Sequence, residues 1–246
     1  MVQILDNTLR DGGYVNDWNF GREKIKQIFS DLVKSKADII EVGLLWADEE
    51  ENLNRTKNSP KTFEKIFKNF NKENSIVIGM IKYGTCPLDL ISPASESFLD
   101  GIRVYFPKNL LNEAIEFCKG IKSKGYKVLV NPVDITSFEE TDLNHLIKLI
   151  NRLKPYSITM VDTYGVLSYE ALEMYYRKLD KGLNAEIRIG FHAHNNINSA
   201  IDNAKAFINI PSTRKKIVDG SLNGMGKNAG NAKTEELLQY LKPANT

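Results

Sequence analysis

Residues 126–162, YKVLVNPVDITSFEETDLNHLIKLINRLKPYSITMVD, contain the repeating unit that decides the fold of this 246-residue chain. The two ends of this stretch, Tyr126–Pro132 and Tyr156–Asp162, are short apolar runs of strand length. Between them, Glu139–Leu153 has the length and apolar spacing of an amphipathic helix. Two strands joined by a helix form a right-handed crossover between parallel neighbours, so the stretch predicts a βαβ unit.

The same alternation of short apolar runs and longer amphipathic stretches extends along the whole chain. The expected strands are Gln3–Asn7, Ala37–Gly43, Ser75–Lys82, Gly101–Phe106, Tyr126–Pro132, Tyr156–Asp162, Ile187–His192 and Lys216–Ser221. The expected helices are Gly21–Ser35, Pro60–Phe70, Asn109–Lys124, Glu139–Leu153, Ser168–Leu179, Ile197–Ile208 and Ala229–Leu241. After the third strand we expect only a short segment, because Pro87 and Pro93 break Thr85–Pro93.

Eight such units in about 250 residues predict the α/β class and a (β/α)8 TIM barrel of parallel strands. No Gly/Ser-rich linker or change of composition divides the chain, so we expect residues 1–246 to form a single catalytic domain. A doubly wound open sheet is the alternative that this pattern also allows.

Composition and charge exclude several classes of protein. Lys and Arg number 33 against 31 Asp and Glu, so a net charge of +2 gives no basic excess for binding nucleic acid. No stretch reaches the ~20 apolar residues of a membrane span, and the N-terminus lacks the pattern of a secretory signal. Cys86 and Cys118 have no CxxC spacing and predict reduced thiols. We therefore expect a cytoplasmic protein with no nucleic-acid or membrane partner.

The sequence FHAHNN, residues 191–196, contains the strongest signal for chemistry. Residues i and i+2 of a strand face the same side, so His192 and His194 can reach one metal ion at the carboxyl end of a barrel strand. An acidic third ligand is needed, and Asp11 in TLRDGG, residues 8–13, is the candidate. The alternatives are two histidines with purely structural partners and an ordinary Asp-Gly turn.

Further polar residues are expected at the carboxyl ends of the strands, where buried charge is costly unless it is paired or functional. They are Asp6, Thr8, Arg10, Glu41, Lys82, Arg103, Tyr105, Asn131, Asp162, Thr163 and Asp219. The glycine-rich segment Gly224–Asn231 indicates either an anion site or a flexible loop. We expect His145 on a helix surface, and Arg214, Lys215 and Lys216 as a solvated run at the opposite end of the barrel.

Five segments in order carry a family resemblance: LDNTLRDGGY (5–14), IIEVG (39–43), VDTYG (161–165), FHAHNN (191–196) and DGSLNGMGKNAGNAKTEELL (219–238). Together they resemble the DRE-TIM metallolyases, which include 4-hydroxy-2-oxovalerate aldolase, hydroxymethylglutaryl-CoA lyase and the isopropylmalate and homocitrate synthases. The segment 224–232 is most similar to the aldolase branch. The resemblance covers essentially the whole chain and implies a metal-dependent carbon–carbon lyase.

The resemblance implies a role for each matching residue. Asp11, His192 and His194 look like the metal ligands, and Asn231 looks like an asparagine near or bound to the metal. Arg10 looks like the arginine that polarises the substrate carbonyl, and Glu41 like the glutamate that supports it. We expect Arg10, Arg103, Asn131 and Thr163 to contact substrate. The implied metal is Mn²⁺ or Mg²⁺, with Zn²⁺ or Co²⁺ as alternatives, the implied partner is a small 2-oxo acid, and the implied assembly is a homo-oligomer.

The chain departs from the aldolase pattern at the catalytic base, because no histidine follows shortly after Asp11. Tyr14 could transfer the proton, although an ordinary phenol is a poor base at neutral pH. Lys82, Tyr105 or a metal-bound water are alternatives. The cysteine of the hydroxymethylglutaryl-CoA branch is also absent from the last loop, which has Lys227 and Asn228. We expect an aldolase or lyase, with an acyl-CoA condensing synthase and a non-catalytic binding barrel as alternatives.

Overall fold

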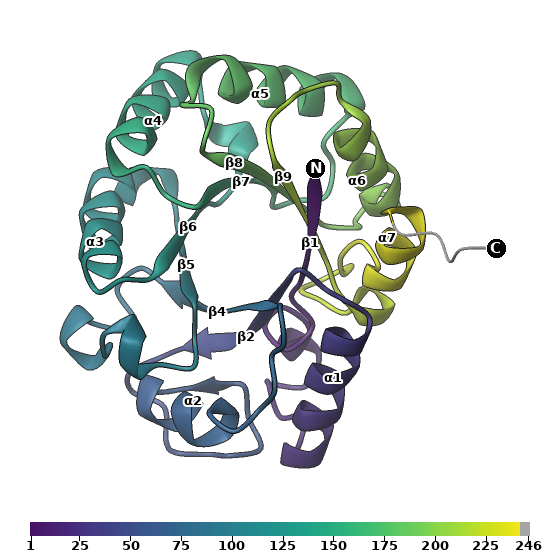
Figure 1. Cartoon of the computed structure of the whole chain (residues 1–246). Coiled ribbons are helices and arrows are strands. Elements are labelled where there is room, and N and C mark those ends of the chain that lie inside the picture. The colour runs from purple at the N-terminus through teal and green to yellow at the C-terminus, as the bar shows by residue number, and fades with distance from the viewer. Residues whose placement is uncertain (242–246) are drawn as a thin grey trace.

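The computed structural model describes residues 1–241, which form one closed barrel of parallel strands surrounded by helices (Figure 1). β1 pairs with β9 on one side and with β2 on the other, and this pairing closes the sheet. The barrel strands are β1 (Val2–Asp6), β2 (Ile39–Leu45), β4 (Ile76–Lys82), β5 (Gly101–Phe106), β6 (Lys127–Pro132), β7 (Ser157–Asp162), β8 (Arg188–Ala193) and β9 (Lys216–Gly220). The predicted single-domain (β/α)8 barrel is confirmed, and the open sheet is excluded.

Apolar side chains fill the barrel interior as a packed layer. The layer consists of residues from five strands that are almost completely buried: Leu5, Ile39, Ile78, Leu129 and Ile217. Two of its members are direct partners in the sheet, because Leu5 of β1 lies opposite Ile39 of β2. The strands also contain buried polar residues, among them Glu41, Arg103 and Asp219.

Seven α-helices cover the outside of the barrel in the described residues. They are α1 (Arg22–Lys34), α2 (Pro60–Phe67), α3 (Leu111–Ser123), α4 (Glu140–Leu153), α5 (Tyr169–Gly182), α6 (Ala200–Asn209) and α7 (Thr234–Leu241). Two helix ends have typical capping residues: the Ser168 hydroxyl accepts from the Ala171 amide at 3.3 Å at the start of α5, and Gly125 follows α3 with φ of +91°. The start predicted for the last helix, Ala229, is wrong, because α7 begins at Thr234 and the residues before it form a loop.

The segment between β4 and β5 has no α-helix. It contains two short 3₁₀ turns, η2 (Leu88–Leu90) and η3 (Ala94–Glu96), each preceded by a proline. The break expected at Pro87 and Pro93 is therefore observed. A two-residue strand, β3 (Lys57–Asn58), pairs with the end of β2 and was not predicted, because two residues carry no periodicity.

At the amino ends of the strands, the prediction of a solvated basic run is wrong for two of its three residues. Arg214 is buried, and its guanidinium donates to the Asp180 carboxylate and to four backbone carbonyls around the end of α5. The buried ammonium of Lys216 donates to the carbonyls of Phe207, Ile208 and Ile210 at the end of α6. Both cations satisfy carbonyls that the last turn of a helix leaves without an intrahelical donor.

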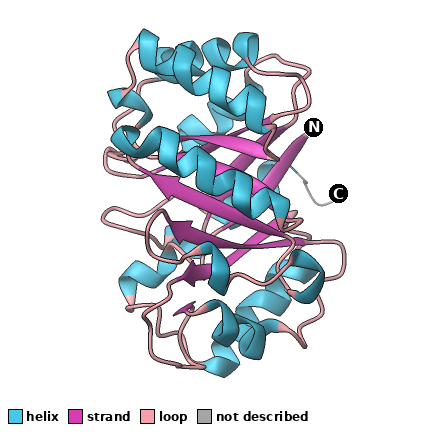
Figure 2. Cartoon of the chain, turned by 90° about the vertical axis from the view of Figure 1, so that its left-hand side faces the viewer, coloured by secondary structure: helices cyan, strands magenta, loops and turns pink. Residues whose placement is uncertain are grey.

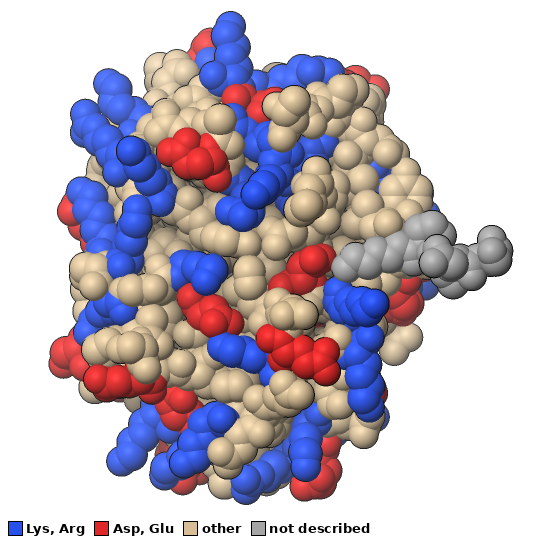
Figure 3. Space-filling model, viewed as in Figure 1, with Lys and Arg blue, Asp and Glu red and all other residues tan. Residues whose placement is uncertain are grey.

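The strand arrows of Figure 2 point the same way, so their carboxyl ends meet at one end of the barrel. On the face shown in Figure 3, Lys and Arg gather beside α3 and α4, and both signs of charge mix elsewhere. Cys86 and Cys118 are buried and free, and burial raises the pKa of each thiol to about 12. None of the helices in residues 1–241 combines the length and apolar character needed to cross a membrane.

Candidate metal centre

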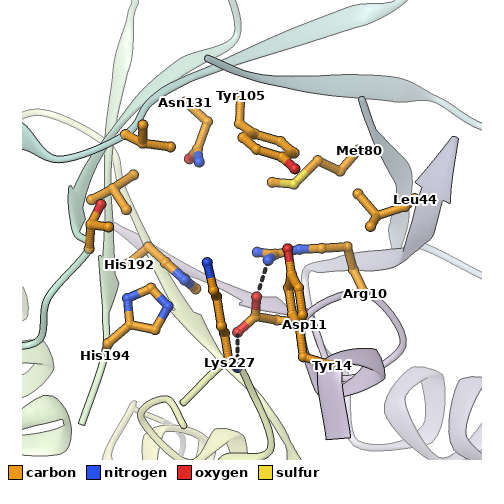
Figure 4. Close-up of a pocket in the computed structure, with 13 residues that line it drawn as sticks. Arg10, Asp11, Tyr14, Leu44, Met80, Tyr105, Asn131, His192, His194 and Lys227 are labelled. Carbon is orange, nitrogen blue, oxygen red and sulfur yellow. Dashed lines mark hydrogen bonds and ion pairs between the residues drawn. The ribbon is translucent and has the colours of Figure 1, made fainter. Parts of the chain in front are cut away.

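A small cavity opens at the carboxyl ends of the barrel strands (Figure 4). Its volume of about 90 Å³ is far below the roughly 300–1,000 Å³ of sites for drug-sized ligands, so it suits a small metabolite. The lining residues come from nearly every strand end: Arg10, Asp11, Tyr14, Leu44, Met80, Tyr105, Asn131, Val133, Val161, Thr163, His192, His194 and Lys227. This is the end of a TIM barrel at which active sites occur.

The two histidines at the end of β8 present corresponding ring nitrogens to the cavity. His192 Nδ1 donates to Asp219 Oδ2 at 3.1 Å, and His194 Nδ1 donates to the Asp162 carbonyl at 2.9 Å. These contacts fix both Nδ1 atoms and leave both Nε2 atoms for a ligand. The rings lie 4.7 Å apart between centroids and nearly perpendicular to each other. The expectation that both imidazoles face one point is therefore met.

Asp11 completes a cluster with the histidines. One ligand atom from each of Asp11, His192 and His194 lies within 4.8 Å of the other two, so the three residues could hold a metal ion. The turn that places Asp11 is tight, because a Cβ on Gly13 would lie only 2.0 Å from the Trp18 ring. Burial alone would raise the pKa of Asp11, but Arg10 and the imidazoles hold it below its ordinary value. The carboxylate is thus in the charged form that binds metal.

Asn231 lies on the other side of Asp11. Its Nδ2 donates to Asp11 Oδ2 at 2.7 Å, while its buried Oδ1 has no hydrogen-bond partner in residues 1–241. An unpartnered amide oxygen beside a carboxylate and two imidazoles fits a hard divalent cation. The last loop can approach because Gly226 has no side chain: a Cβ there would lie 2.6 Å from Asp11 Oδ2. The donor set therefore fits the metal that the family resemblance implies.

Arg10 lies beside the cluster and is fixed by two carboxylates. Its Nε donates to Glu41 Oε2 at 2.7 Å, and its NH1 donates to Asp11. Glu41 is fully buried in the middle of β2 rather than at the strand end, which was the expected position. Burial alone would lower the pKa of Arg10, but Asp11 and Glu41 raise it above its ordinary value. The guanidinium is therefore a permanent positive charge with one edge toward the cavity.

Arg103 was expected to contact substrate, but it lies beneath the cavity and does not line it. It is completely buried, and its NH1 and NH2 donate to the Asp219 carboxylate at 2.7 and 3.0 Å. Burial would raise the pKa of Asp219, yet Arg103 and His192 lower it to about 2. Arg103 thus keeps Asp219 ionised under His192, which is a supporting position rather than a contact with a ligand.

The remaining expected contacts with substrate line the cavity. Asn131 is buried, points into the cavity in Figure 4, and its Oδ1 has no partner in the described part of the chain. Thr163 lines the wall, where its Oγ1 accepts from the Asp134 amide at 2.7 Å. Tyr14 and Tyr105 are hydrogen-bonded to each other, and burial raises the pKa of both phenols. Lys82, the other basic candidate, is exposed and outside the lining.

Lys227 lines the cavity but was not predicted as a site residue. Its only sequence signal was its position in the glycine-rich segment, four residues before Asn231. Such segments are often plain loops, so the signal was weak. In the structure the segment has a defined position, because the side-chain nitrogen Nδ2 of Asn231, at its end, donates a hydrogen bond to Asp11 Oδ2.

Comparison with known proteins identifies the family. The family model described as HMGL-like matches residues 1–245. The chain belongs to the HMGL-like family. Its relatives include a 4-hydroxy-2-oxovalerate aldolase of Pelotomaculum thermopropionicum, 27% identical over 99% of this chain and 70% of that protein. A homocitrate synthase of Pyrococcus abyssi is 24% identical over 97% of this chain and 64% of that protein.

Solved structures show the same fold for this HMGL-like chain. The N-terminal domain of an aldolase candidate from Bacteroides vulgatus superposes with a TM-score of 0.77 at 23% identity, covering 98% of this chain and 79% of that one. The chain spans about two-thirds of the length of the curated relatives named above. The resemblance to the DRE-TIM group, which includes aldolases, lyases and synthases, is therefore confirmed at the level of the family.

Proposed function

We propose that this chain is a divalent-metal-dependent aldolase or lyase that makes or breaks a carbon–carbon bond in a small 2-oxo acid. The observation that carries the proposal is the meeting of Asp11, His192 and His194 within 4.8 Å, with Arg10 bound to Asp11. The aldolase relatives support this reaction class, and the small cavity supports a small substrate. The expected reaction releases or consumes a pyruvate-like enolate.

Asp11, His192 and His194, with Asn231 beside them, are the residues that would hold the metal. When bound, a divalent ion supplies Lewis-acid stabilisation of the negative charge that develops on the keto oxygen. A carboxylate, an amide oxygen and two imidazoles suit Mn²⁺ or Mg²⁺, and Zn²⁺ or Co²⁺ are the alternatives.

Arg10 supplies a second source of positive charge for the same oxygen. Glu41 holds the guanidinium by Nε, so little reorganisation is needed when negative charge develops next to it. A lysine at this position could not donate to Glu41 and to the substrate with the same planar geometry. We therefore assign to Arg10 the binding and stabilisation of the oxyanion.

Tyr14 fits a proton donor better than a proton acceptor. Burial raises the pKa of its phenol, so the hydroxyl keeps its proton at neutral pH. In the cleavage direction, the hydroxyl on the fourth carbon passes its proton to water, the bond between the third and fourth carbons breaks, and the fourth carbon leaves as a carbonyl compound. The electron pair moves to the keto oxygen, and the third carbon then takes a proton. We assign the last proton to Tyr14, with Tyr105 as its hydrogen-bond partner.

A condensing synthase is the second candidate, because a homocitrate synthase matches over nearly the whole chain. It would use the same ligands and the same arginine. The two reactions differ in the second substrate, so release of a free thiol from an acyl-CoA with a 2-oxo acid would favour the synthase.

The proposal is tested without knowing the aldehyde, because an enzyme that stabilises a pyruvate enolate exchanges the methyl protons of pyruvate with solvent. The experiment follows deuterium incorporation in D₂O by NMR, with Mg²⁺ and with a chelator. We expect exchange that requires metal and that is slower in the Arg10→Lys variant. The rate should not change in the Arg177→Lys variant, since Arg177 is an exposed residue of α5 paired with Glu173. Absence of exchange, or exchange equal with and without chelator, would refute the proposal.

A further inference from the structure

Lys227 reaches into the cavity from a fixed backbone position. Its amide nitrogen lies 3.4 Å from Asp11 Oδ2, and the preceding residue, Gly226, packs against Asp11 and Asn231 with no space for a side chain. Figure 4 shows the Lys227 side chain running from the loop into the cavity between His192 and Tyr14. Its ammonium lies 5.7 Å from the centroid of the Tyr14 ring. The direction of the side chain thus follows from packing around Asp11.

The Lys227 ammonium differs from the other cations of the site in having no carboxylate partner. Arg10 is bound by Glu41 and Asp11, and Arg103 by Asp219. In residues 1–241 no carboxylate oxygen lies within 4.0 Å of Lys227 Nζ. A lysine that enters a cavity without a protein counter-ion is available to an anionic ligand.

Pairing the charges of the site shows which positive charge lacks a counter-ion. A divalent ion with Asp11 leaves one positive charge, and the carboxylate of a 2-oxo acid neutralises that charge. Arg10 and Glu41 cancel each other, as do Arg103 and Asp219. The positive charge of Lys227 remains, and the other side chains that line the cavity are neutral: they are apolar, as Leu44 and Val161 are, or uncharged polar groups such as Asn131.

We propose that Lys227 binds a second carboxylate, at the end of the substrate remote from its keto group. The substrate is then a dicarboxylic 2-oxo acid, and Lys227 is the residue that selects it over a monocarboxylic one. This inference rests on the proposed function, because the keto end of the substrate must lie at the metal ligands for the other end to be read by Lys227.

The test compares two stable 2-oxo acids of equal length, 2-oxoglutarate and 2-oxovalerate, which differ by a terminal carboxylate in place of a methyl group. Binding of each to the Mg²⁺-loaded protein is measured by calorimetry for the wild type, Lys227→Met and Lys227→Arg. Lys26→Met, which removes an exposed lysine from α1, is the matched control. Thermal melts confirm that each variant is folded.

We expect the wild type to bind 2-oxoglutarate at least about tenfold more tightly than 2-oxovalerate, as a charge-assisted contact allows. Lys227→Met should abolish this preference while changing the affinity for 2-oxovalerate less than about twofold, and Lys227→Arg should retain part of it. Equal losses for both acids, or an unchanged preference, would overturn the assignment. Failure of both acids to bind in a metal-dependent way would instead refute the proposed function.

Discussion

The two ends of the barrel both bury cationic side chains, yet they use them differently. At the amino ends of the strands, Arg214 and Lys216 donate to backbone carbonyls at the ends of α5 and α6. At the carboxyl ends, Arg10 is bound by Glu41 and by the candidate metal ligand Asp11. Arg103 is bound by Asp219, which also contacts the candidate ligand His192. Burial of a charge does not by itself distinguish a functional end from a structural one.

The convergence of unpartnered oxygens with a carboxylate and two imidazoles on one cavity makes the distinction. Around the cavity, buried oxygens of Glu41, Asn131 and Asn231 have no hydrogen-bond partner within residues 1–241. The ammonium and guanidinium groups of the amino end have several acceptors each. A buried polar atom without a partner costs free energy, and one such atom, Ser157 Oγ, also lies at the amino end. At the carboxyl end, the unpartnered oxygen of Asn231 lies beside Asp11, and this arrangement indicates a ligand.

The largest expected effect comes from removing a candidate metal ligand at the carboxyl end. His192→Ala should lower metal-dependent exchange of pyruvate protons by at least about 1,000-fold, roughly 4 kcal/mol in activation free energy. His145→Ala is the matched control, since His145 is an exposed residue of α4 that contacts Asn112. Equal exchange rates in His192→Ala and His145→Ala would contradict the assignment of the functional site to the carboxyl end.

The next effect concerns stability at the amino end. Arg214→Met leaves the Asp180 carboxylate and several carbonyls without their donor, so the free energy of unfolding should fall by about 3 kcal/mol. The exchange rate per folded molecule should not change. Arg177→Met, at an exposed ion pair, should cost less than about 1 kcal/mol. Urea titration measures both, and a loss of exchange in folded Arg214→Met would show that the ends are not separable.

The third effect, from Arg10→Lys at the carboxyl end, concerns the exchange rate. The lysine keeps the positive charge but loses the planar contact with Glu41, so exchange should fall about 100-fold, roughly 2.7 kcal/mol. The metal should still bind, because Asp11, His192 and His194 remain. Titration of Mg²⁺ against the exchange rate separates the two effects. A large loss of metal affinity with a normal maximal rate would contradict the role assigned to Arg10.

The smallest effect is a pH dependence of stability in the metal-free protein. Burial, followed by repulsion from His192, lowers the pKa of His194 to about 4 from an ordinary 6.5. The unfolded chain therefore takes up a proton on this residue first as the pH falls. His194 should lower the free energy of unfolding by about 1.4 kcal/mol between pH 7.5 and 5.5. The loss of stability due to His194 should reach its full size below pH 4, where the residue is protonated in both the folded and the unfolded chain.

The His194→Gln variant isolates that contribution. Asp6 acts in the opposite sense, because burial raises its pKa to about 6 and its protonated form favours the folded state. Only the difference between the wild type and His194→Gln is therefore informative. Urea titrations of both proteins in the presence of chelator should give curves that separate as the pH falls from 7.5 to 5.5. Parallel curves would contradict the account of His194.

The fold could be predicted because the barrel strands and the α-helices have lengths at which periodicity is readable. The runs Gly101–Phe106 and Lys216–Ser221 match β5 and β9 to within a residue. The start of α7 was missed because the residues before it alternate polar and small side chains, and their position is set by contacts of Asn231 with Asp11. Long-range contacts of this kind leave no local pattern.

The site could be predicted only where spacing carries information. The two histidines of a His-x-His pair on a strand face the same side, so His192 and His194 could be assigned together. Asp11 could be assigned because it stands in the glycine-containing turn TLRDGG, residues 8–13. The positions of Arg103 and Arg214 could not be predicted, because a guanidinium at a strand end can face a cavity, a carboxylate or a set of carbonyls. The partners of these residues, Asp219 and Asp180, lie 116 and 34 residues away in sequence.

Metal binding tests the central claim most directly, namely that Asp11, His192 and His194 at the carboxyl end form a divalent-cation site. Equilibrium dialysis against Mn²⁺ should give one tightly bound ion per wild-type chain and per His145→Ala chain. Asp11→Asn, His192→Ala and His194→Ala should each weaken binding by at least about 100-fold, roughly 2.7 kcal/mol per lost ligand. Unchanged Mn²⁺ binding in all three ligand variants would contradict the account.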